Sequence, residues 1–245
     1  MTPSFGPRLG SGPRPPAGFS LLEFIVALLI LTVMMGAVFA QIDLLQKRAR
    51  AEQSKLDSFQ QARNFVDLLA RDVHNAGYPN TRVLDPSVFT QSPVVNDPRL
   101  AVGLVKVDSG ELRLETLDDQ GNVLSVVYQL VSTGTACPCL RRSQAFKIPG
   151  NPLTQQSLAL ENGVEHVQNT TLFAAYDGNG NAVALPVDMN SNPAAIAGIK
   201  TLDVVLTVRG DLRDAQSGQY PVTTLRSTIR LLQCSSVATG QANSC

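Results

Sequence analysis

The chain has 245 residues with 20 basic and 20 acidic side chains, so its formal net charge is zero. This balance leaves no strongly basic surface of the kind that binds nucleic acid, and no polybasic membrane patch. Hydrophobic residues make up 44% of the chain and aromatic residues 5%, with no Trp. The composition supports one globular core, and the few aromatics argue against a sugar-binding or base-stacking surface.

An apolar run at 19–40 follows a Pro-rich opening and carries a single charge, Glu23. As a helix rising about 1.5 Å per residue, the run is long enough to cross a bilayer. A simple membrane anchor and a secretory signal peptide both explain this length, and Val38-Phe39-Ala40 is an acceptable signal-peptidase site. Neither explains the acid, because an ionisable side chain inside a membrane normally has a partner or a function.

Cleavage of the chain between Gly18 and Phe19 would give Glu23 a partner. The new α-amino group would lie just over one helical turn from the carboxylate. In a helical stack of such subunits, the amine of one chain could neutralise Glu23 of its neighbour inside the apolar core. Removing either charge would leave the other buried and unpaired, at a cost of about 3–5 kcal/mol. We therefore expect Glu23 to set the register of an assembly.

The segment GFSLLEFIVALLILTVMMGAVFA, residues 18–40, resembles the class III signal of type IV pilins and type II secretion pseudopilins. The resemblance implies that prepilin peptidase cuts after Gly18, and that Phe19 becomes the N-methylated first residue. Glu23 is then the acid five positions into the mature chain. A second stretch, FQQARNFVDLLARDVHNAGYPN at residues 59–80, is similar to the PilW-like minor pilins. Within it, Arg71 and Asp72 are expected to be solvated or to cap the end of the helix.

The apolar run is expected to continue into one long helix. No proline occurs between Phe19 and Tyr78, and good helix formers dominate residues 41–76. Gly77, followed by Tyr78-Pro79, predicts a C-cap and a stop. Apolar residues recur mostly at spacings of three and four, which predicts one buried face formed by Leu45, Ala49, Leu56, Phe59, Ala62, Val66, Leu69, Val73 and Ala76.

Beyond the helix, short alternating runs predict a β-rich head. We expect a hairpin at 104–117 with Leu112 and Leu114 on one face, and a strand at 122–131. The sequence DGNGN at 177–181 predicts a hairpin turn. Two further strands are expected at 202–209, with Leu202, Val204, Leu206 and Val208 inward, and at 223–232, with Leu225, Ile229 and Leu231 inward; residues 80–98 and 132–165 are expected to be mostly loop.

The expected fold is therefore α+β: a pilin fold in which a long N-terminal helix packs against an antiparallel β-sheet head. The domains are expected to be a leader peptide at 1–18, a transmembrane or filament-core half of the helix at 19–40, an amphipathic half at 41–78, and a β-rich globular head at 79–245. The half-buried strands of the head need a cover, and the amphipathic half of the helix offers one.

The four cysteines, Cys137, Cys139, Cys234 and Cys245, all lie in the distal half of the chain. If that half is exported, they can form disulfides. A bridge within Cys137-Pro138-Cys139 would close a tight ring, so we favour longer-range pairs, with Cys139–Cys234 first.

No metal site is expected, because the only histidines, His74 and His166, do not complete a ligand set with the cysteines. We expect no cofactor, and no catalytic cluster stands out in the sequence. The chain is therefore expected not to be an enzyme.

The resemblance implies a minor pilin of a type IV pilus system that helps to initiate or tip pilus assembly, and so supports twitching motility, adhesion or DNA uptake. The implied partners are other pilins and minor pilins, prepilin peptidase, the inner-membrane pilus assembly machinery and membrane lipid, with no nucleic acid evident. The alternatives are a type II secretion pseudopilin and a membrane-anchored periplasmic binding domain.

The resemblance also implies a single pass through the inner membrane with a periplasmic head, and later a place in the pilus filament or its tip. Charge alone would not orient the chain this way. Lys47, Arg48 and Arg50 beyond the apolar run outnumber Arg8 and Arg14 before it.

Overall fold

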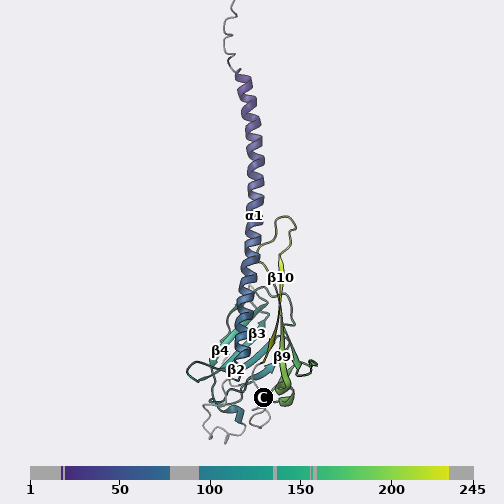
Figure 1. Cartoon of the computed structure of the whole chain (residues 1–245). Helices are drawn as coiled ribbons and strands as arrows, with labels where there is room; N and C mark the ends of the chain where they lie inside the picture. The colour runs from purple at the N-terminus through teal and green to yellow at the C-terminus, as the bar shows by residue number, and fades with distance from the viewer. Residues whose placement is uncertain are drawn as a thin grey trace, which may run out of the picture. The chain divides into compact units, whose positions relative to one another are not determined.

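The computed structural model describes Gly18 and residues 20–77, 94–134, 137–154, 156 and 159–231, apart from the side chain of Asn162 (Figure 1). The chain forms two compact units, Met1–Gln46 and Lys47–Cys245. Helix α1 (Leu21–His74) has 54 residues and contains the boundary between the two units. A long N-terminal apolar helix and antiparallel sheets are the predicted α+β fold, which is confirmed.

The remaining elements all lie in the second unit. In chain order they are η2 (Val94–Asn96), β1 (Leu104–Val107), β2 (Glu111–Leu117), β3 (Val123–Val131), β4 (Cys139–Phe146), β5 (Glu161–Val164), β6 (Phe173–Asp177), β7 (Ala182–Val183), β8 (Val187–Asp188), α2 (Pro193–Gly198), β9 (Ile199–Arg209) and β10 (Val222–Arg230).

The predicted helix stop is found slightly early. Helix α1 ends at His74, and a turn leads to Gly77, whose φ of 77° is the left-handed conformation that glycine adopts freely. The Gly77 N–H donates to the carbonyl of Glu115 in β2, at 2.9 Å. The end of the helix is therefore fixed against the sheet. Tyr78 and the predicted connection up to residue 93 lie outside the described residues.

The buried face of α1 differs in part from the predicted one. The predicted positions from Ala62 to Ala76 are buried: Ala62, Val66, Leu69, Val73 and Ala76. Ala49 and Leu56 are exposed, and so is Leu45 in the first unit, so the prediction was wrong there. At about 100° per residue, Ala49 and Leu56 lie roughly opposite Leu69 on the helix. The buried stripe instead includes Ala51 and Phe65.

Two antiparallel sheets form the head. The six-stranded sheet has the order β5-β4-β3-β2-β1-β8, and the four-stranded sheet has the order β10-β9-β6-β7. The predicted hairpin at 104–117 is β1–β2, with Leu112 and Leu114 fully buried, and β3 matches the next predicted strand. In β9, the predicted inward residues Leu202, Val204, Leu206 and Val208 are all buried.

The remaining strand predictions give a mixed result. Strand β10 matches, with Ile229 buried and Leu225 and Leu231 packed against the core. The DGNGN turn joins β6 to β7 as expected. Most of the described residues at 132–165 lie outside strands, as expected, but the prediction missed β4 and β5, which lie in this segment. Strand β4 reads CLRRSQAF, so its polar residues hide a strand that pairs with β3 at every position.

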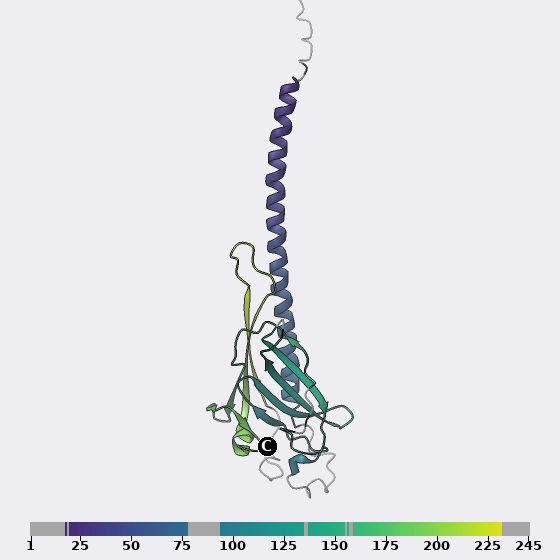
Figure 2. The ribbon, with the colours of Figure 1, turned by 180° about the vertical axis from the view of Figure 1, so that it is seen from behind.

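One hydrophobic core joins the second-unit part of α1 to both sheets. It includes Leu69 of α1, Tyr128 of β3, Leu206 of β9 and Ile196 of α2. Figures 1 and 2 show the last turns of α1 alongside the strands of the six-stranded sheet. The helix thus covers apolar strand faces that would otherwise meet water.

The head also contains a buried ion pair, formed by Lys147 and Glu115. Lys147 and Glu115 have fully buried side chains, and Lys147 Nζ lies 2.9 Å from Glu115 Oε2. Nζ also donates to the carbonyls of Val95 and Leu100, which gives it the three acceptors that an ammonium group needs. Burial raises the pKa of Glu115 and lowers that of Lys147, while their mutual attraction opposes both shifts. Lys147, which directly follows β4, therefore links the segment before β1 to Glu115 of β2.

Gly163 in β5 should tolerate no side chain. A Cβ placed on it would collide with the carbonyl oxygen of Leu140 in β4. We expect Gly163→Ala to lower the free energy of unfolding by about 1–3 kcal/mol or more, because the backbone must move to relieve the clash. Gly198→Ala is the matched control, since a Cβ added to Gly198 would meet nothing within 4 Å. Thermal unfolding followed by circular dichroism measures both, and equal melting temperatures would contradict the β4–β5 register.

Candidate functional site

The predicted processing site lies at the start of α1. Gly18 and Ser20 are described, whereas Phe19 lies outside the described residues. The carbonyl of Ser20 accepts a hydrogen bond from the Phe24 N–H at 3.2 Å, so the helical bonding begins directly after the predicted cut. Glu23 is exposed in the first turn, where the positive end of the helix dipole favours an acid.

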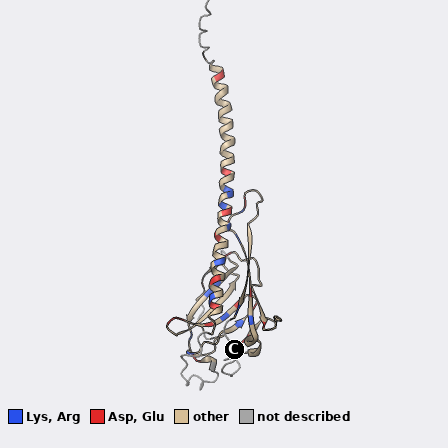
Figure 3. Ribbon diagram, viewed as in Figure 1, with Lys and Arg blue, Asp and Glu red and all other residues tan. Residues whose placement is uncertain are grey.

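The helix around Glu23 presents an uncovered apolar surface. Its most apolar 18-residue window has a mean hydropathy of 2.6, and none of it is buried. The exposed fractions of its large apolar side chains run from 78% at Leu21 to 45% at Leu28. Figure 3 shows this stretch almost entirely in tan, with one acidic residue in red near its start. By length and composition the segment can cross a membrane, and its surface needs lipid or other apolar chains around it.

A polar cluster fastens α1 to the head. Tyr128 of β3 donates its hydroxyl hydrogen to Asp72 Oδ2 of α1 at 2.5 Å. Arg142 of β4 donates to the same oxygen through Nε at 2.9 Å, and its Nη2 lies 2.8 Å from it. Phe65, two turns earlier on α1, packs edge-on against the Tyr128 ring at a centroid distance of 5.5 Å. One carboxylate therefore joins the helix to two adjacent strands.

Electrostatics keeps this cluster in one protonation state. Burial, reinforced by the negative charge of Asp72, raises the pKa of the Tyr128 hydroxyl. Burial alone would lower the pKa of Arg142, but the Asp72 carboxylate and the Tyr128 hydroxyl together outweigh it and raise that pKa. Tyr128 therefore stays a neutral donor and Arg142 stays a cation, which is the state that the bonds to Asp72 require.

Sequence reasoning missed this cluster. Asp72 was expected to be solvated or to cap the end of the helix, and that interpretation was wrong, because its exposed fraction is only 8%. The available signal was its position three residues after Leu69 and directly before Val73, two residues on the face predicted to be buried. An acid close to that face needs a cationic or donor partner.

The cysteines pair differently from the prediction. Cys137 and Cys139 form a disulfide with a Cα–Cα distance of 4.4 Å. The preference for longer-range pairing, and for Cys139–Cys234, was therefore wrong. The two Cα atoms lie at the short end of the separations that disulfides bridge, so the two-residue spacing does not prevent the bond. Cys234 and Cys245 lie outside the described residues.

Residues 14–39 match the family model described as Prokaryotic N-terminal methylation motif. The chain carries a type IV pilin-like prepilin signal. No curated protein and no solved structure matches the chain. The match covers the signal and most of the apolar half of α1, and it does not extend to the head.

The prepilin signal accounts for the coarse properties of the chain. At the family level it implies processing by prepilin peptidase and assembly with other pilins. Together with the exposed apolar helix it is consistent with membrane anchoring and incorporation into a pilus. A structural signal of this type also fits a protein that is not an enzyme. Within the described ranges, no group of three or more His, Cys, Asp or Glu side chains is placed to hold a metal ion.

Loss of the Asp72 carboxylate should loosen the helix from the head. We expect Asp72→Ala to lower the free energy of unfolding by about 3 kcal/mol, because Arg142 and Tyr128 would be left without their shared acceptor. Asp67→Ala removes an exposed acid from the same helix and should change stability by less than about 0.5 kcal/mol. Urea denaturation of the detergent-solubilised full chain measures both. Similar losses in the two variants would show that the cluster does not fasten the helix.

Proposed function

We propose that the chain is a minor pilin of a type IV pilus system, a structural subunit that helps to initiate pilus assembly or to form the pilus tip. The observation that carries the proposal is the prepilin signal followed directly by an uncovered apolar helix with one acid in its first turn. The resemblance of residues 59–80 to minor pilins supports the finer assignment.

The proposed processing supplies a partner for Glu23. Cleavage after Gly18 and methylation of Phe19 would leave a positively charged secondary amine at the new N-terminus. Glu23 has no cationic residue of its own helix nearby, because the first basic residue after it is Lys47. We propose that the amine of an adjacent subunit pairs with Glu23 and fixes the register between the two apolar helices. Such a pair stabilises the assembly appreciably only where the surroundings exclude water.

The proposed division of the chain follows from this processing. Residues 1–18 are the leader, 19–40 the membrane or filament-core segment, 41–78 the second half of the long helix, and 79–245 the head. We place the head in the periplasm while the subunit is in the inner membrane, and at the cell surface after assembly. Adhesion, twitching motility or DNA uptake would then depend on this subunit through pilus assembly.

Replacement of Glu23 tests the proposal. In the native host, we expect Glu23→Ala to leave the amount of the protein in the inner membrane unchanged and to reduce the number of pili per cell at least about tenfold, since an unpaired buried charge costs several kcal/mol. Pili are counted by electron microscopy, and the protein is measured by immunoblot of membrane fractions. Glu52→Ala, which removes an exposed acid beyond the apolar run, is the matched control and should be normal.

Three outcomes of this experiment separate the candidate functions. A normal pilus count for Glu23→Ala would contradict the register role of the acid. Normal pili with a loss of type II secretion would identify a pseudopilin instead. Normal pili and normal secretion in cells that lack the whole protein would favour a membrane-anchored binding domain that does not polymerise.

A further inference from the structure

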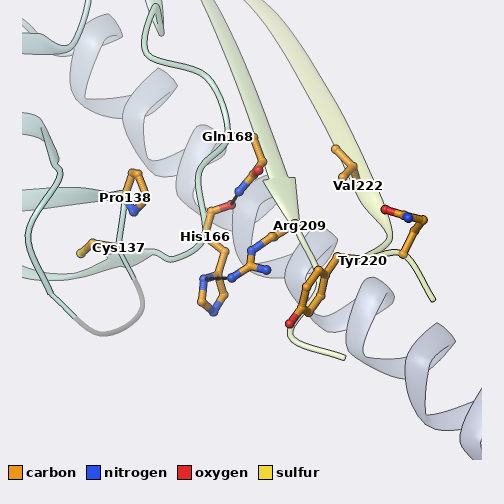
Figure 4. Close-up of a pocket in the computed structure, with 8 residues that line it drawn as sticks. Cys137, Pro138, His166, Gln168, Arg209, Tyr220 and Val222 are labelled. Atoms are coloured by element: carbon orange, nitrogen blue, oxygen red, sulfur yellow. Dashed lines mark hydrogen bonds between the residues drawn. The ribbon is translucent and has the colours of Figure 1, made fainter. Parts of the chain in front are cut away.

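A small pocket opens in the head where β9 ends and β10 begins. Its volume is about 360 Å³, near the lower limit of small-molecule sites. Figure 4 shows Arg209 and His166 pointing toward one another in its wall, with the Tyr220 ring beside them. Its lining includes Cys137, His166, Gln168, Arg209, Gln219 and Tyr220. The Cys137–Cys139 disulfide fixes one side of the pocket.

Two guanidinium groups gather on one tyrosine at this pocket. The Cζ atom of Arg209 lies 4.2 Å from the centroid of the Tyr220 ring, and that of Arg213 lies 4.9 Å from it. The two neighbouring guanidinium groups, that of Arg213 first and then that of Arg209, lower the pKa of Tyr220. Two cations held against one neutral ring repel each other, and the ring quadrupole offsets only part of that repulsion.

The nearby acid does not neutralise these arginines directly. Asp211 Oδ1 lies 2.9 Å from His166 Nε2, and His166 Nδ1 lies 3.4 Å from Arg209 Nη2. The His166 ring therefore lies between Arg209 and Asp211, with one ring nitrogen facing each of them. In the part of the chain that the structure describes, no carboxylate lies within 4.0 Å of the nitrogens of Arg209 or Arg213. Arg209, Arg213 and Asp211 together carry one net positive charge. Asp214, on the same loop, accepts hydrogen bonds from Gln216 and Ser217 within its own turn.

We propose that this pocket binds the carboxylate group of a peptide side chain, a ligand that would bring the missing negative charge against the Arg209 guanidinium, beside its contact with Tyr220. A guanidinium group offers two parallel N–H donors that match the two oxygens of a carboxylate. The hydroxyl of Tyr220 and the amide groups of Gln168 and Gln219 supply neutral hydrogen-bonding partners at the rim for the peptide backbone. The recognised feature is therefore an exposed Glu or Asp on a partner protein.

The charge of the pocket favours a carboxylate over a polyanion. One net positive charge balances a monoanion such as a carboxylate better than a phosphate monoester, which carries nearly two negative charges. Nucleic acid binding requires several basic residues along the path of the backbone. Here Asp211 and Asp214 lie on the same loop as Arg213, and they interrupt any such path.

Peptide titration tests the proposal. The probe is the blocked tripeptide acetyl-Gly-Glu-Gly-amide, with acetyl-Gly-Gln-Gly-amide as its uncharged control. The full chain, in non-ionic detergent and with ¹⁵N-labelled arginine, is followed through the side-chain Nε–H resonances. We expect the Glu peptide to shift the Arg209 and Arg213 resonances saturably, and the Gln peptide to leave them in place. Propionate in the same titration distinguishes a free carboxylate from a peptide-borne one: tighter binding of the peptide is expected, and equal binding would overturn the peptide assignment.

Substitutions locate the binding. Arg213→Gln changes an exposed residue that should not affect folding, and we expect it to weaken the Glu peptide at least fivefold. Arg209→Gln should weaken it more, since Arg209 lines the pocket. Arg226→Gln, which removes an exposed arginine from the middle of β10, is the matched control and should change the affinity less than twofold.

Three further results would overturn the proposal. The first is the absence of a saturable shift with the Glu peptide. The second is an equal loss of affinity in the Arg226→Gln variant, which would show general attraction to the surface. The third is tighter binding of a short DNA duplex than of the Glu peptide through the same two arginines, which would make the pocket part of a nucleic-acid site.

Discussion

The structure depends on one constraint: the apolar surface of the first half of α1 has to be kept from water. From Leu21 to Phe39 the large apolar side chains are about half exposed or more, and the only charge among them is Glu23. Inside one chain nothing covers this surface in the described residues, so lipid before assembly and neighbouring helices after it are the available environments. Because α1 continues without a break into the head, the element that meets these apolar surroundings is also the element that organises the β-sheets. The Asp72 cluster and the Glu115–Lys147 pair then place polar anchors inside a core that apolar packing alone would leave free to slide.

The parts of the fold that could be predicted are those with a strong local period. The apolar run, the helix, the alternation of Leu202 to Val208, and the DGNGN turn all follow from spacings within a few residues. The prediction failed where tertiary contacts override the local pattern. Strand β4 is hidden because Arg142 lies on it as a partner of Asp72, and a polar strand of this kind carries no apolar alternation. The prediction of the buried helix face failed at Ala49 and Leu56 because two apolar stripes follow one another along α1. Residue spacing alone does not say which of these stripes meets the sheet.

The candidate functional residues also fall into those that the local sequence could predict and those that it could not. The prepilin signal could be predicted because it is a short local motif at the start of an apolar segment, and the roles of Gly18, Phe19 and Glu23 within it stay predictions. The pocket at Arg209 and Tyr220 was not predictable, because its walls come from four separate stretches of sequence and its charge depends on how Asp211 and His166 pair. The Cys137–Cys139 bond is a further case: the ring size suggested strain, but only the backbone path shows that the two Cα atoms are close enough.

The central claim is that Glu23 is kept in an apolar helix because processing creates its partner. The most direct measurement is the mass of the mature N-terminal peptide, taken by mass spectrometry from protein isolated from its native membrane. The account predicts a chain that begins at Phe19 and carries one added methyl group. A chain that begins at Gln41 would contradict it, because Glu23 would be absent from the mature protein. An uncut chain that begins at Met1 would contradict it as well, because no new amine would exist to pair with the carboxylate.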